Sequence, residues 1–103
     1  MSYNEIMIVH LEGERISSIA TATGLISRGG HMISAISLDG GTAATGATAV
    51  INDSTDASGT DKWILRAPQY GSSNIAFPKP IPITSGIYLT LTGTASKLSI
   101  AYT

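Results

Sequence analysis

The chain has 103 residues, which is enough for one hydrophobic core, and no shift in composition marks a second domain. Its six basic residues are scattered singly and the formal net charge is −1, so nucleic acid is not an expected partner. There is no cysteine, which excludes a disulfide framework, a thiolate metal site and a cysteine nucleophile.

The surface chemistry favours burial against a partner. Only 13% of the residues are charged, and the mean hydropathy is +0.22, so little charge is available to keep separate copies apart. The apolar run at residues 6–11 is too short to span a bilayer, and no signal-peptide pattern precedes it. We therefore expect no membrane association.

The first half of the chain reads as strands. Residues 6–11 (IMIVHL) are a β-branched apolar run that predicts a buried strand. Residues 15–28 predict a second strand with a bend at Gly24, because an isolated glycine within a strand pattern suggests a bulge. Residues 31–38 predict a third, which stops at the turn signal Asp39-Gly40-Gly41.

Two more strands surround a polar loop. Residues 47–52 predict one strand, with Ala47, Ala49 and Ile51 opposed to Thr48 and Val50. Residues 61–67 predict the other, with Trp63 and Leu65 on one face and Lys62, Ile64 and Arg66 on the other. Between them, residues 53–60 (DSTDASGT) contain no large apolar side chain and predict a loop.

The last thirty residues organise the rest of the chain. Residues 74–77 predict a short strand, and the prolines at 78, 80 and 82 make the following segment an edge or a crossing between sheets. Residues 87–92 and 97–102 alternate with period two around Gly93-Thr94, which predicts a terminal β-hairpin.

About eight strands with regular turn signals and no convincing helix predict an all-β fold, an antiparallel β-sandwich that is jelly-roll-like. We expect a single domain over residues 1–103, in which residues 1–14 form an N-terminal arm or an interface strand.

No reactive constellation is evident. His10 and His31 are the only histidines, no G-x-S-x-G motif is present, and the aspartates stand near strand ends, where they favour turns and caps. The spacing of Asp53, Asp56 and Asp61 does not match a calcium loop. We expect no enzyme activity, no metal and no cofactor.

Candidate interface residues stand at the N-terminus and in one loop. The uncharged apolar run would be an aggregation hazard if it stayed unpaired, so we expect it to pair within the subunit or across an interface. The candidate interface residues are Tyr3, Asn4, Glu5, Ile6, Met7, Ile8 and Tyr70. Trp63 is expected in the core or an interface, and Tyr70, in a Gly/Ser loop, is the best exposed aromatic.

The last sixty residues carry a family resemblance. An alternating strand at 47–53, the DSTDASGT loop, a Phe-Pro segment with P-I-P-I, the run S-G-I-Y-L-T-L-T-G and a short terminal strand follow in order. This order resembles the small β-sandwich virion proteins of tailed bacteriophages, most closely the capsid decoration (cement) proteins. The N-terminal forty residues match nothing in that pattern.

The resemblance implies a non-enzymatic protein without cofactors. It would bind the major capsid protein as a homotrimer and stabilise the outer face of an icosahedral head, after a period in the host cytoplasm during assembly. Two alternatives stay open: a tail or fibre module, and a carbohydrate-binding module for host attachment that uses an exposed aromatic such as Tyr70.

Overall fold

The computed structural model describes residues 16–103, which form eight β-strands and no helix. The first four strands are β1 (Ile16–Ala20), β2 (Gly24–Arg28), β3 (His31–Asp39) and β4 (Ala47–Asp53). The other four are β5 (Thr60–Ala67), β6 (Ser72–Ile83), β7 (Gly86–Thr92) and β8 (Lys97–Tyr102).

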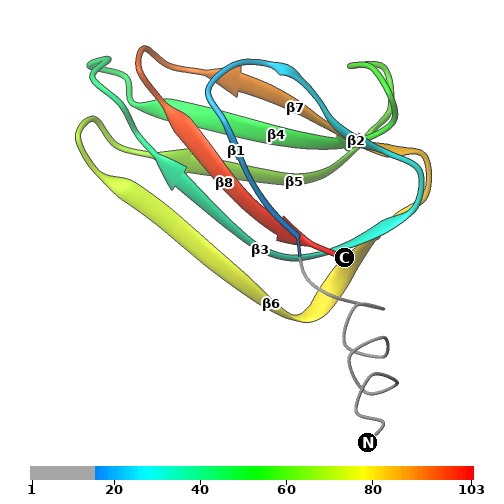
Figure 1. Ribbon diagram of the computed structural model, residues 1–103. Helices are drawn as coiled ribbons and strands as arrows, with labels where there is room; N and C mark the ends of the chain where they lie inside the picture. The colour runs from blue at the N-terminus through cyan, green and yellow to red at the C-terminus, as the bar shows by residue number, and fades with distance from the viewer. Residues whose placement is uncertain (1–15) are drawn as a thin grey trace, which may run out of the picture.

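The strands form two four-stranded antiparallel sheets that face each other (Figure 1). One sheet has the order β1-β8-β3-β6 and the other β2-β7-β4-β5. The pairs β1–β8, β2–β7, β3–β6 and β4–β5 are nested within one another along the chain. This is the connectivity of a jelly roll, so the expected β-sandwich with about eight strands is confirmed.

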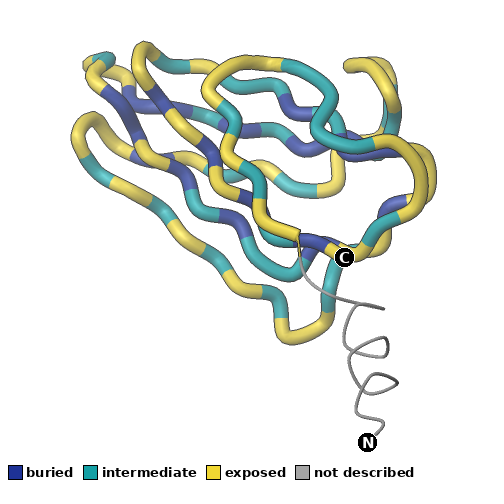
Figure 2. Tube along the Cα trace, viewed as in Figure 1, coloured by how far each residue is buried: buried dark blue, intermediate teal, exposed yellow. Residues whose placement is uncertain are grey.

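Period-two alternation determines which side chains enter the core. On β7, Ile87 and Leu89 are fully buried, and on β8 Leu98, Ile100 and Tyr102 are buried, as the sequence predicts. Figure 2 shows the resulting alternation of buried and less buried residues along these strands. The large side chains with almost no exposed surface come from both sheets: Ile33, Leu38, Ile51, Ile87, Leu89, Leu98 and Ile100.

Two expectations from the sequence are wrong because alternation does not say which sheet a strand joins. Residues 15–28 are not one bent strand, since β1 and β2 lie in different sheets. Thr23 fixes the crossing between them: its hydroxyl accepts a hydrogen bond from Leu91 N at 2.9 Å and donates to Leu91 O at 3.2 Å.

The terminal β-hairpin is the second correction. β7 pairs with β2 and β4, whereas β8 pairs with β1 and β3, so residues 93–96 carry the chain across the core from one sheet to the other. Within this connection, Ser96 Oγ donates to Gly93 O at 2.8 Å and Ala95 adopts a φ of 59°.

The proline-rich segment is a continuous part of β6. It lies at the edge of its sheet, and this confirms the expectation of an edge position. The register against β3 shifts between Ile33 and Ala35, where residues 77–80 have no ladder partner. Pro78 and Pro80 therefore occupy the interval where no N–H donor is needed.

Asp53 fastens the end of β4 to the β6–β7 turn. Its carboxylate accepts hydrogen bonds from Ser85 N at 2.7 Å, from Thr84 N at 3.0 Å and from the Thr84 hydroxyl at 3.0 Å. The N–H of Ser85, followed by the donors of Thr84, holds the pKa of this carboxyl below its usual value. The expected position of Asp53 near a strand end is confirmed, but the N–H groups that it binds belong to a turn distant in the chain rather than to its own.

The lowered pKa of Asp53 makes part of the stability depend on pH. The bonds to the ionised carboxylate stabilise the fold fully above the ordinary carboxyl pKa of about 3.9, and this contribution is lost as pH falls through the lowered native value. Asp53→Asn should cost about 1 kcal/mol near neutral pH. It should also flatten the decline in the free energy of unfolding below about pH 5, measured by urea titration. If the free energies of unfolding of wild type and Asp53→Asn decline in parallel as pH falls, the Asp53 carboxylate does not cause the pH dependence.

Removing a core side chain should be far more costly than removing a surface one. Leu89→Ala should lower the free energy of unfolding by about 3 kcal/mol or more, because Leu89 is fully buried between the sheets. Ile64→Ala, on the exposed face of β5, should cost less than about 1 kcal/mol. Urea unfolding followed by the fluorescence of Trp63 measures both. If both variants lose the same free energy of unfolding, Leu89 is not a core residue.

Candidate interaction surface

The outer face of the β1-β8-β3-β6 sheet carries two rows of mostly small, uncharged residues. In one row Ser17, Ala101, Ala35 and Ala76 are register neighbours across all four strands. In the next row Ile19, Ser99, Ser37 and Asn74 are neighbours in the same way. We call these eight residues the small-residue face.

A shallow groove with a volume of about 490 Å³ runs over the small-residue face. It is lined by residues 17–19, 35–37, 74–76 and 99–101. None of these residues belongs to the opposite sheet, so the groove lies on the outside of the sandwich rather than in its core. Short side chains leave the backbone of the strands within reach of another molecule.

Two of the polar side chains on the small-residue face are bonded to each other. Ser37 Oγ donates to Asn74 Oδ1, and the neighbouring Ser34 Oγ donates to Ala101 O at 3.1 Å. No charge stands within the eight residues, and the nearest charged pair, Asp39 and Lys97, are register neighbours at one end. Another protein could therefore cover this face without burying an unpaired charge, which would be costly.

The outer face of the β2-β7-β4-β5 sheet is different. β5 presents Lys62 and Arg66 on that side, because Trp63 and Leu65 between them turn inward and pack against the core. The central strands add Thr48, whose register neighbour is Thr92, and Thr90, whose register neighbour is Val50. Of the two outer faces, the one that carries the small-residue face is better suited to close contact with protein.

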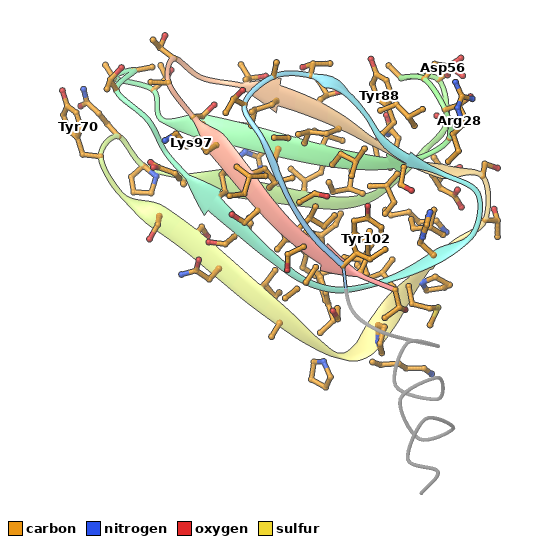
Figure 3. The ribbon with its side chains drawn as sticks, viewed as in Figure 1. Arg28, Asp56, Tyr70, Tyr88, Lys97 and Tyr102 are labelled. Carbon is orange, nitrogen blue, oxygen red and sulfur yellow. The ribbon has the colours of Figure 1, made fainter. Side chains whose placement is uncertain are left out.

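Tyr70 is the most exposed large apolar residue among residues 16–103, at 76% of its full surface. Figure 3 shows it projecting from the β5–β6 turn, at one end of the sandwich. Its φ of 59° lies in the left-handed region, which is unusual for a bulky residue. Tyr70 N donates to Gly41 O at 2.9 Å and Gly71 N to Pro68 O at 3.0 Å, so the strained turn is held in place.

The strain at Tyr70 suggests that the ring serves contact rather than stability. Tyr70→Asn should leave the melting temperature unchanged or raise it slightly, because asparagine tolerates the left-handed region and the exposed ring contributes little packing. Differential scanning calorimetry measures this. A loss of stability above about 1 kcal/mol would instead make the ring a structural element.

The remaining interface candidates from the sequence, Tyr3, Asn4, Glu5, Ile6, Met7 and Ile8, lie outside the described residues, as does His10. His31 is bound to backbone: its Nε2 lies 2.8 Å from Arg28 O and its Nδ1 lies 3.2 Å from Thr103 O. It joins the start of β3 to the end of β8.

Asp39 and Asp56 are likewise used within turns. Asp39 Oδ1 accepts from Gly41 N at 3.0 Å, and Asp56 Oδ1 accepts from Ser58 N at 2.8 Å. Asp61 accepts from the side chain of Asn52. Residues 16–103 contain no group of three or more His, Asp or Glu side chains placed to hold a metal ion. Within the same residues, no helix is long and apolar enough to cross a membrane.

Trp63 belongs to the interior edge of the sandwich, in agreement with its expected place in the core or an interface. Its ring meets Phe77 edge to face, with centroids 4.9 Å apart, and closes the side between β5 and β6. Its buried Nε1–H has no hydrogen-bond partner among the described residues. The ring is therefore not an open platform for a sugar.

The sequence matches no protein-family model and no curated protein. Among solved structures, the chain is similar to one from work described as "Bacillus endospore appendages form a novel family of disulfide-linked pili". The identity is 18%, the alignment covers 87% of this chain and 85% of that chain, and the TM-score is 0.46. A likeness at this level carries no inference about function.

Proposed function

We propose that this chain is a structural protein of a tailed-phage virion, a decoration protein that binds the major capsid protein on the outer surface of the head. The observation that carries the proposal is the small-residue face, an uncharged groove-bearing sheet surface opposite a more polar one. The choice of the major capsid protein as partner rests on the resemblance of the last sixty residues to decoration proteins.

The physical case rests on what a non-enzymatic binding protein needs. A flat sheet face of short, uncharged side chains can approach another surface closely, and the apolar surface buried there would contribute to binding. Binding in many copies makes modest contacts sufficient when several engage together. Because a jelly roll serves many unrelated functions, the fold alone does not support the assignment to a virion.

Two matched arginine substitutions test which face binds. Ala101→Arg places a long charged side chain on the small-residue face, and Thr90→Arg places one on the outer face of the opposite sheet. Both positions are partly buried and lie on central strands. We expect wild type and Thr90→Arg to co-sediment with undecorated capsids of the phage whose genome encodes the chain, and Ala101→Arg to lose at least tenfold in affinity.

Wild-type protein that never co-sediments with these capsids would remove the proposal. Equal binding by both variants would keep a capsid partner but assign its contact to another surface. Circular dichroism and urea unfolding of each variant confirm that a loss of binding does not come from a loss of folding.

A carbohydrate-binding module is the second candidate, favoured by the exposure of Tyr70 at a rigid turn. An exposed aromatic ring can stack on a sugar, and Tyr70→Ala should then abolish binding on a glycan array. Wild-type protein without a glycan hit would exclude this candidate.

Immunolabelling of virions separates a head protein from a tail or fibre module.

A further inference from the structure

The free edge of β1 differs from the other sheet edges of the described residues. β1 contains no charge and no proline, and its register against β8 continues without a shift. It also exposes two large apolar side chains, Ile19 at 73% and Ile16 at 48%. An exposed, uncharged edge of this kind is a template for pairing with another strand.

The other three edges carry features that discourage pairing. β6 contains Pro78, Pro80 and Pro82 and exposes no large apolar side chain. On β5, the exposed Ile64 stands between Lys62 and Arg66. β2 has a register shift and ends in Arg28. A strand that adds to β1 needs a free edge of its own, so β1 of a second copy is the best match that the described residues offer.

The sequence of β1, ISSIA, is complementary to itself when two copies run antiparallel about Ser18. On the outer face each Ile19 then stands opposite Ser17 of the second copy. On the inner side each Ile16 stands opposite Ala20 of the second copy. Each large side chain thus meets a small one, and no like charges face each other.

We infer that two copies of this chain associate through β1, edge to edge, about a twofold axis at Ser18. The contact joins the two β1-β8-β3-β6 sheets into one continuous sheet of eight strands and covers Ile16 and Ile19 in both copies. This pairing is isologous, so it closes after two copies. It differs from the homotrimer that the family resemblance implies, and it does not depend on the proposed capsid partner.

The absence of cysteine from the sequence makes a direct test available. Ser18→Cys introduces a single thiol that lies opposite its own symmetry mate, where directly opposed Cβ atoms are about 4.5–5.5 Å apart. Ile64→Cys is the matched control, since it places one thiol on the edge strand β5. Under mild oxidation, we expect Ser18→Cys to form a covalent dimer at least tenfold faster than Ile64→Cys.

Mass in solution tests the same contact without a cross-link. Light scattering over rising concentration should show wild type approaching twice the mass of one chain, which is 10.6 kDa. Ile19→Lys should weaken the dimer at least tenfold, because two lysines would face each other diagonally across the axis, whereas Ile64→Lys should have no effect.

Three results would overturn the inference. A trimer in which Ser18→Cys cross-links no faster than the control requires a different edge. If the protein stays monomeric at all concentrations and both thiol variants cross-link equally slowly, β1 does not pair with a second copy. A chain that dimerises only after residues 1–15 are removed shows that its own N-terminal segment covers β1 instead.

Discussion

Packing between the inner faces of the two sheets is the interaction on which the rest of the structure depends. Neither sheet can form alone, because each one carries a full apolar face, and each face is covered only by the other sheet. Ile33 and Leu38 come from one side, and Ile51 and Leu89 from the other. Asp53, Thr23 and His31 bind backbone groups where the chain turns between strands or ends, so the polar side chains support the geometry that the core requires.

Because the core is made by the inner faces, the outer faces are free to differ. One carries Lys62 and Arg66, and the other carries alanines and serines with a groove along them. Small residues contribute little to the packing of a monomer, since they face away from the core. Their concentration on one sheet agrees with the proposed contact with another molecule, as does the edge at β1, which has no second strand partner among residues 16–103.

The inward residues of β4, β5, β7 and β8 could be read from the sequence, because alternation reports directly which side chains are buried. The sheet membership of consecutive strands could not. Gly93-Thr94 has the local sequence of a hairpin turn. The folded structure shows instead that Ile87 and Leu98 are buried in the same core from different sheets, so the chain crosses between the sheets at this point. The interpretation of Gly24 as a bend within one strand is wrong for the same reason. A glycine at a crossing between sheets and a glycine at a bulge within one strand look alike in the local sequence.

The candidate surface was missed from the sequence because it consists of residues from four strands that meet only in the folded sheet. Ser17, Ala35, Ala76 and Ala101 are individually unremarkable, and their shared row depends on the register. Tyr70 was found, because an aromatic beside glycine and serine is a local signal. Its left-handed backbone conformation was not predicted, and the bond from Tyr70 N to Gly41 O that holds the turn joins residues that are distant in the chain.

The pairing of β1 with β8 also determines the order in which the protein can be completed during translation. Ile16 and its partner Tyr102 are separated by 86 positions, and at ordinary elongation rates the second emerges roughly 4–17 s after the first. Until then β8, which lies between β1 and β3, is missing, and both neighbours present open backbone to the cell. The nascent chain thus spends seconds without a central strand of this four-stranded sheet, and the sheet is completed only when β8 has left the ribosome.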